Sequence, residues 1–320
     1  MNAIVEPNAK QFFDSVNKWY AGATVRNSPR IIVPEAANGE FTYPKSRQIL
    51  SEHPKVQELG YKGVAYVLTQ SAYQYMYEIG LLETRFVIDC SLNIINNVIT
   101  GASEEEKLDA LTVVIDEGYH AHVAMDYIIQ MKTLSGVEPL EVPQTNGNLS
   151  AVKRAFELLP DHVHNDFQLI SVTLAEHTLT KDLISIGREK DASAAFTKVM
   201  TDHVSDEGRH ASYFAKMMKA HWARLPEEHK QIIGSMLPAY LDDYLAADEE
   251  RDFDRKILRA SGFSEAQVTE IIDDTQAQFL DNLTSYVVTT KANLVKLLQR
   301  TGVLDHASTR AAFIQHGVAL

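Results

Sequence analysis

The chain carries the hexapeptide DEGYHA at residues 116–121 and repeats it, with one change, as DEGRHA at residues 206–211. Each copy contains the pattern Glu-x-x-His. On an α-helix, residues three apart lie on one face with about 5 to 6 Å between their Cβ atoms, so each copy can offer a carboxylate and an imidazole to one metal ion. Two copies therefore predict two ions.

The composition narrows the classes of partner and compartment. The 320 residues include 30 basic and 43 acidic side chains, a net charge of −13 that repels nucleic acid and anionic membrane surfaces. The lone cysteine, Cys90, cannot form an internal disulfide, which fits a reducing compartment. The first residues lack an export signal, and no uncharged apolar run approaches the roughly 18 residues of a membrane span. We expect a cytoplasmic protein without nucleic-acid or membrane partners.

Apolar residues at helical spacing predict an all-α fold built on four long helices. Ser103 and Glu106 form a Ser-x-x-Glu capping box that starts the second helix, and Asp191 is the predicted N-cap of the fourth. The expected bounds are 62–100 before Gly101, 103–134, 150–187 with a break at Pro160, and 191–225. A short helix at 10–20 and an irregular arm at 30–54 precede them, and helices at 227–247, 249–260, 264–274 and 276–301 follow.

Counting from the turns adds two glutamates to the candidate site. Glu117 follows Gly101 by 16 residues and Glu83 precedes it by 18, so in an antiparallel pair they differ in height by about 3 Å. Around Asp191, Glu207 and Glu176 lie 16 and 15 residues from the turn. All four glutamates should therefore meet at one level, with the second half of the bundle repeating the first.

The resulting set of four carboxylates and two imidazoles indicates a dimetal centre. Hard oxygen donors with one nitrogen per ion suit iron or manganese, and we favour iron. Four buried glutamates would repel one another strongly without cations. Solvated charges on helix faces would explain a single Glu-x-x-His but not two matched copies with two level glutamates. The set is Glu83, Glu117, His120, Glu176, Glu207 and His210.

These residues resemble the ferritin-like diiron superfamily, and His203 narrows the resemblance. It lies four residues before Glu207, whereas the equivalent position beside Glu117 is Val113. With this third histidine the pattern resembles the p-aminobenzoate N-oxygenase family of non-haem diiron enzymes. The resemblance implies a seventh metal ligand at His203, and two inequivalent irons.

The resemblance also implies an activity and partners. Members activate O₂ as a peroxo species and oxidise an amine to a hydroxylamine, nitroso or nitro compound. The amine is a small molecule, free or tethered to a carrier protein, in a biosynthetic reaction. Because the chain has no dinucleotide-binding motif or cysteine cluster, the electrons must come from a separate reductase or ferredoxin. A homodimer is also expected. The whole chain, 1–320, should form one ferritin-like domain, with an arm at 1–60, the bundle at about 60–222 and a helical cover at 223–320.

Supporting roles are predicted for five further residues, while the substrate-binding residues stay unknown. Asp116 and Asp206 should accept hydrogen bonds from ligand histidines across the bundle. Arg209 is a candidate to neutralise one of these aspartates, with a solvated charge as the alternative. Thr180, on the metal-facing stripe, is a candidate proton relay, with an ordinary helix-face threonine as the alternative. Tyr213 could line a pocket or hold a radical, with core packing as its alternative.

Two other functional classes share the same metal ligands. One comprises other diiron oxidases, such as C–H hydroxylases, desaturases and radical-generating subunits, which usually lack a counterpart of His203. The other is a ferritin-like iron-handling protein without an organic substrate. The roughly 100 residues after the bundle argue against iron handling, because storage subunits need little beyond four helices.

Overall fold

The computed structural model describes residues 7–34, 41–143, 146–246 and 251–318, and within these ranges the regular structure is helical. An isolated bridge between Phe41 and Ala192 is the one β-type pairing there. The all-α, ferritin-like fold class is confirmed. None of the helices in the described part of the chain is long and apolar enough to cross a membrane.

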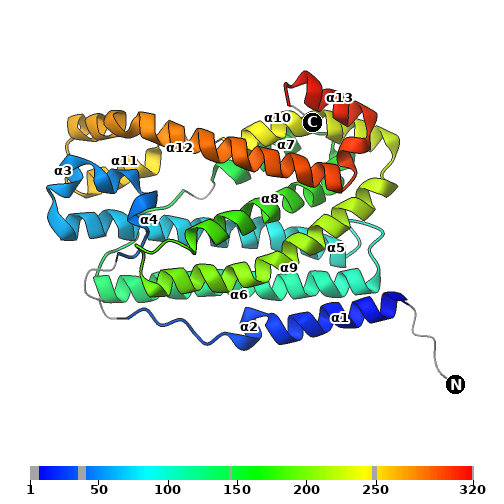
Figure 1. Cartoon of the computed structure of the whole chain (residues 1–320), viewed down its shortest axis with the longest axis horizontal. Coiled ribbons are helices and arrows are strands. Elements are labelled where there is room, and N and C mark those ends of the chain that lie inside the picture. Colours follow the sequence, from blue (N-terminus) through cyan, green and yellow to red (C-terminus); the bar gives the residue numbers. More distant parts are fainter. Residues whose placement is uncertain (1–6, 35–40, 144–145, 247–250, 319–320) are drawn as a thin grey trace.

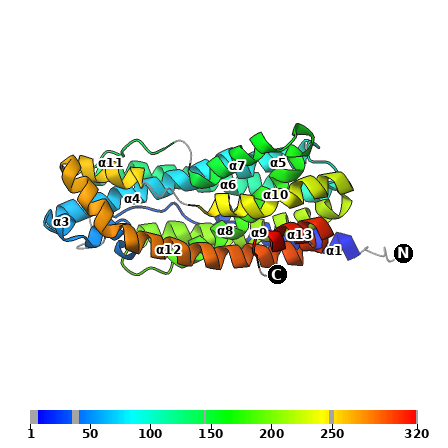
Figure 2. The ribbon, with the colours of Figure 1, turned by 90° about the horizontal axis from the view of Figure 1, so that it is seen from above.

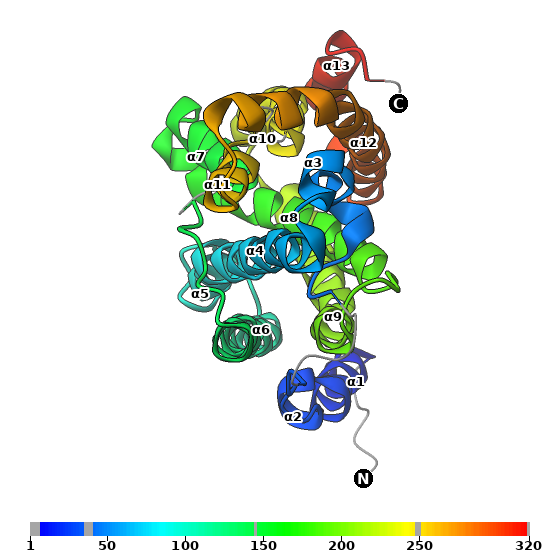
Figure 3. The same ribbon diagram turned by 90° about the vertical axis from the view of Figure 1, so that its left-hand side faces the viewer.

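The central bundle consists of four long rods that run side by side (Figures 1 and 3). The first rod has three consecutive parts, and the other three rods are single helices. In chain order the parts are α4 (Gly60–Leu82), a π-helical turn (Glu83–Val87), α5 (Ile88–Ile95), α6 (Glu104–Ser135), α8 (His164–Ile186) and α9 (Ala194–Arg224).

Local capping signals set the start of α6 as predicted. The Ser103 hydroxyl accepts from the Glu106 amide while the Glu106 carboxylate accepts from the Ser103 amide, a complete capping box. Gly101 adopts a left-handed φ of 86°, so the turn before α6 requires glycine. The preceding helix ends earlier than predicted, at Ile95, because the chain already turns at Asn97, whose φ is 59°.

Two other boundaries differ from the prediction. The N-cap of α9 is Ser193, whose hydroxyl accepts from the Phe196 amide, because Asp191 instead accepts from the Ser46 amide. The predicted break between 274 and 276 is wrong. One helix, Glu265–Arg300, continues through Thr275, whose side chain is buried and donates its hydroxyl to the Ile271 carbonyl.

Further helices form a layer on each side of the bundle (Figures 2 and 3). On one side, α1 lies against α6, and α2 lies against both α6 and α9; on the other side, α3, α7 and the C-terminal helices cover α4 and α8. The bounds are α1 (Pro7–Gly22), α2 (Thr24–Asn27), α3 (Pro54–Gln57), α7 (Gly147–Leu158), α10 (Glu227–Leu245), α11 (Asp252–Ala260), α12 (Glu265–Arg300) and α13 (Ala307–Gln315), with 3₁₀ turns at Lys45–Arg47, Ile49–Glu52, Asp161–Val163 and Val303–Asp305.

The apolar core of the bundle is divided along its length. One cluster of buried side chains contains Phe86 and Val113, and a second contains Ile79 and Ala124. Along α6, α8 and α9, the predicted ligands fall between the residues of these two clusters. The candidate site is therefore a polar layer between two apolar ones, where electrostatic interactions are only weakly screened.

Candidate metal centre

All seven side chains predicted as ligands converge in the middle of the bundle. They form two groups that share Glu117, and within each group the ligand atoms lie within 4.8 Å of one another. All of them are buried. The first group is Glu83, Glu117, His120 and His203, and the second is Glu117, Glu176, Glu207 and His210.

The histidines of the two repeats direct the same ring atom toward the carboxylates. Nδ1 of His120 lies 3.1 Å from Glu117 Oε2, and Nδ1 of His210 lies 2.8 Å from Glu117 Oε1. The same two nitrogens lie 3.6 and 3.3 Å from Glu207 Oε1. Glu117 and Glu207 therefore occupy the centre, each within reach of an imidazole from both repeats.

His203 extends the first group only. Its Nε2 lies 2.8 Å from Glu83 Oε1 and 3.1 Å from Glu207 Oε1. Its ring lies beside that of His120, with 4.0 Å between the ring centroids. The equivalent position on α6, Val113, belongs to the apolar core. The first group thus offers two imidazoles, and the second offers one.

The donor atoms fit metal ions better than they fit one another. Among the residues that the structure describes, both carboxylate oxygens of Glu83, Glu176 and Glu207 are buried and lack a hydrogen bond of good geometry, although His203 approaches Glu83 and Glu207 closely. So are Glu117 Oε1, His203 Nε2 and His210 Nδ1. Such orphaned polar atoms cost about 1–3 kcal/mol each, and more when charged. Oxygen-rich donors with imidazole nitrogens suit iron or manganese, so the residues present fit the predicted metals.

The ionisation of these groups is strongly perturbed. Burial raises the pKa of Glu83 to about 7. Burial, together with the nearby charge of Glu207, raises the pKa of Glu176 well above its usual value. Burial opposes the charged form of His120, but hydrogen bonds to neighbouring carboxylates raise its pKa to about 9. Repulsion among buried carboxylates is relieved by cations, which metal ions would supply.

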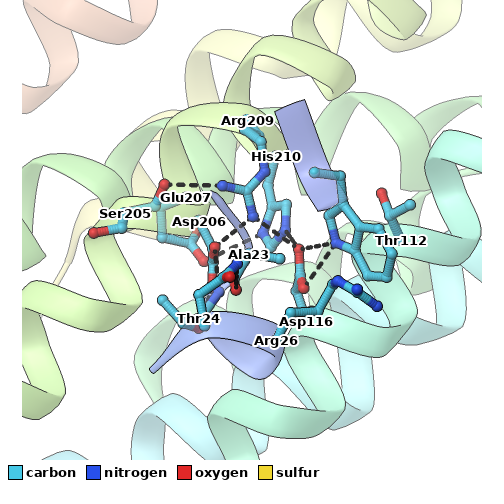
Figure 4. Close-up of polar contacts among 12 residues, drawn as sticks. Ala23, Thr24, Arg26, Thr112, Asp116, Ser205, Asp206, Glu207, Arg209 and His210 are labelled. Atoms are coloured by element: carbon cyan, nitrogen blue, oxygen red, sulfur yellow. Dashed lines mark hydrogen bonds and ion pairs between the residues drawn. The ribbon is translucent and has the colours of Figure 1, made fainter. Parts of the chain in front are cut away.

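Two aspartates bind the outer nitrogens of the histidines crosswise, each reaching from one repeat to the other. Asp206 Oδ2 lies 3.0 Å from His120 Nε2, and Asp116 Oδ2 lies 3.2 Å from His210 Nε2. Arg209 donates to both aspartates (Figure 4). Burial would raise the pKa of Asp206, but hydrogen bonds from His120 and other donors lower it to about 2. Both histidines can therefore keep Nδ1 facing the carboxylates, the arrangement that metal binding requires.

The two remaining predicted residues make main-chain contacts. The Thr180 hydroxyl donates to the carbonyl of Glu176, at 2.8 Å. The Tyr213 hydroxyl donates to the Glu106 carbonyl, at 2.9 Å, in the first turn of α6. A proton relay through Thr180 and a pocket or radical role for Tyr213 stay predictions.

Two contacts to the aspartates have no sequence signal. The Trp19 indole donates to Asp116, and Thr24 donates to Asp206 through both its amide and its hydroxyl. These donors lie 97 and 182 residues from their acceptors. No periodicity or motif connects the N-terminal segment to the repeats, so sequence reasoning missed both.

A surface cavity of about 280 Å³ lies on the side of the bundle that the N-terminal segment covers. Its walls come from residues 25–31 and from α6 and α9. A void of about 10 Å³, near the size of one water molecule, shares Ile31, Tyr119 and Val123 with this cavity. Its walls include both His120 and His203. Ile31 of the N-terminal segment, Tyr119 and Val123 of α6 and Val199 of α9 therefore border both spaces.

The sequence matches a model of a known protein family. The family model described as P-aminobenzoate N-oxygenase AurF matches residues 35–299. That range contains all seven converging side chains, and it begins after Trp19 and Thr24. No curated protein matches the chain.

Proposed function

Because the chain belongs to the p-aminobenzoate N-oxygenase family, we propose that it is an O₂-dependent non-haem diiron monooxygenase that oxidises an amine nitrogen. The products would be a hydroxylamine or, after further oxidation, a nitroso or nitro compound. The observation that carries this proposal is the set of orphaned carboxylate and imidazole atoms, including His203, at the centre of the matched residues.

The protein residues would perform three tasks. Glu83, Glu117, Glu176, Glu207 and the three histidines would hold two iron ions, which when reduced supply the electrons that activate O₂. Asp116 and Asp206 would keep two of the imidazoles in the metal-binding orientation. The apolar clusters on both sides of the polar layer would exclude bulk water.

The stoichiometry defines the external partners. Conversion of an amine to a hydroxylamine inserts one atom of O₂ into the N–H bond and reduces the other to water, which consumes two electrons and two protons. We propose a reductase or ferredoxin as the electron donor. We also propose a cytoplasmic homodimer, a single domain over residues 1–320, and an arylamine or other small amine, free or carrier-bound, as substrate.

The test is to load the protein with Fe(II), add a chemical reductant and ¹⁸O₂, and analyse a panel of amines by mass spectrometry. We expect two irons per chain and an ¹⁸O-labelled N-oxygenated product. An iron content well below two per chain would refute the dimetal centre. Full loading without a product from any amine would instead favour iron handling.

Two variants on α6 provide a matched control. His120→Ala removes a predicted ligand, and we expect it to lose metal and product together. His122→Ala removes a histidine two residues further along, which borders the surface cavity rather than the ligand groups. The second variant should keep its iron and its product. Equal losses in both variants would contradict the assignment of His120.

A further inference from the structure

The N-terminal segment crosses the bundle beside the candidate metal centre. Helices α1 and α2 lie along α6 and α9 (Figures 1 and 3). Trp19 is only 9% exposed and Thr24 only 4%, although Lys18 and Tyr20 beside Trp19 are exposed. This burial means that Trp19 and Thr24 are directed into the bundle.

Each of these two side chains ends on a different aspartate. The Trp19 Nε1 hydrogen lies between both carboxylate oxygens of Asp116, each 3.0 Å from the nitrogen. The Thr24 amide donates to Asp206 Oδ1 at 3.2 Å, and its hydroxyl donates to Oδ2. Figure 4 shows Thr24 directed at Asp206 on the side of the aspartates that faces α1 and α2.

The contacts continue into the ligand groups. Asp116 contacts His210 Nε2, and Asp206 contacts His120 Nε2. Two short series of hydrogen bonds therefore connect the N-terminal segment to the two histidines. Both aspartates are fully buried. Their carboxylate oxygens therefore need hydrogen-bond donors from the protein. Arg209 donates to one oxygen of each aspartate, and the other oxygen of each needs a different donor.

We propose that Trp19 and Thr24 are positioning residues of the metal centre, and that the packing of the N-terminal segment 15–27 on the bundle and the binding of metal stabilise one another. The segment fixes Asp116 and Asp206 in the orientation that holds His210 and His120. It lies outside the residues that match the family model. Because coupling between two sites is reciprocal, metal should in turn tighten the segment against the bundle.

This inference rests on the metal centre of the proposed function but not on amine oxygenation. The test titrates the metal-free protein with Co²⁺ and determines the dissociation constants by chelator competition. Trp19→Phe keeps the aromatic ring and removes the N–H donor. Thr24→Val keeps the shape of the side chain and removes the hydroxyl donor. We expect each to weaken Co²⁺ binding about 10- to 100-fold, as is typical when a partner of a metal-binding histidine is disturbed.

Two conservative variants separate positioning from packing. Thr24→Ser restores the hydroxyl and should bind Co²⁺ within about twofold of the wild type. Tyr20→Phe changes the exposed neighbour of Trp19 and should do the same. Far-UV circular dichroism and thermal unfolding of the metal-free proteins check that all variants fold alike. If Trp19→Phe and Thr24→Val both bind Co²⁺ like the wild type, the inference is wrong.

Hydrogen exchange gives the reciprocal measurement without any turnover. In the wild type, Co²⁺ should slow amide exchange across residues 15–27, and the slowing should shrink in Trp19→Phe. If Co²⁺ does not change the rate of amide exchange across residues 15–27, the inference is wrong. A wild type that binds two ions while the variants bind equally well overturns this inference and leaves the oxygenase proposal standing, whereas a wild type that binds no ions overturns both.

Discussion

The two halves of the bundle carry the same ligand pattern but differ at two positions. In each half, the first helix supplies a glutamate and the second supplies Glu-x-x-His. Glu83, however, begins a π-helical turn, whereas Glu176 lies within the regular helix α8. His203 on α9 also corresponds to the apolar Val113 on α6. Repetition thus creates the two groups of candidate metal ligands, and these departures make the two groups chemically different.

The difference has an electrostatic consequence. Glu83 faces the imidazole of His203, and its pKa rises only to about 7 despite complete burial. Glu176 lies beside the carboxylates of Glu207 and Glu117, and burial together with their charges raises its pKa well above its usual value. π-Helical turns often occur at functional sites because they redirect a side chain. We therefore expect the ion beside Glu176 to depend on carboxylates, and the ion beside Glu83 to be richer in nitrogen.

The largest effect should come from removing what both halves share. Glu117 belongs to both ligand groups. We expect Glu117→Ala to lose both ions and to lower N-oxygenation at least about 1000-fold, which corresponds to about 4 kcal/mol. Metal analysis and product yield check this. Glu176→Ala is the comparison, because it should keep more iron than Glu117→Ala; equal loss in both would contradict the shared position.

The crosswise aspartates allow each side to be weakened separately. Asp206→Asn should mainly weaken the ion held by His120, and Asp116→Asn the ion held by His210, each by about 10- to 100-fold. Stepwise Co²⁺ titration followed by visible absorption would resolve the two sites. Identical titration curves for both variants would argue against the crosswise pairing.

Making the halves alike should remove the asymmetry. His203→Val places on α9 the residue that α6 carries at Val113. We expect two ions to remain bound, with about tenfold weaker binding at one site. The absorption spectra of Co²⁺ at the two sites should become more similar. Val113→Ala is the control, because it changes the equivalent position without touching a ligand. Unchanged spectra in His203→Val would show that His203 is not a ligand.

A smaller effect concerns Glu78, a second acidic residue on the first rod. The corresponding position before Glu176 is Ser171. Burial raises the pKa of Glu78 to about 7. The unfolded chain ionises near 4.5, so the carboxyl of the folded protein keeps its proton longer, and stability should fall as the pH rises from about 4.5 to 7.

Glu78→Gln should remove this fall and gain about 1–3 kcal/mol over the wild type at pH 8. Urea unfolding of the metal-free protein at several pH values measures it. A difference between variant and wild type that does not change with pH would contradict a raised pKa for Glu78.

Regular helix geometry made much of the site predictable. The rise per residue is constant, so counting from Gly101 and Asp191 placed Glu83 and Glu176 at the height of the repeats, and the structure brings all four glutamates together. The N-cap of α9 is Ser193 rather than Asp191. This error of two residues changes the predicted height of the glutamates by only about 3 Å, so the predicted level stayed correct.

Features that depend on distant contacts could not be predicted. Gly80 lies three residues before the π-helical turn at Glu83, but a glycine within a helix does not by itself predict such a turn. The helix around Thr275 continues although its sequence is polar. Thr275 also accepts a hydrogen bond from Arg251, the N-cap residue of α11. The contacts of Trp19 and Thr24 join segments that no shared pattern relates.

The most direct measurement is anomalous diffraction at the iron edge from crystals of the Fe(II)-loaded protein. We expect two iron peaks within the polar layer, both next to Glu117, with His203 bound to the iron beside Glu83. A single peak, no peak, or His203 turned away from both irons would contradict an asymmetric dimetal centre at these residues.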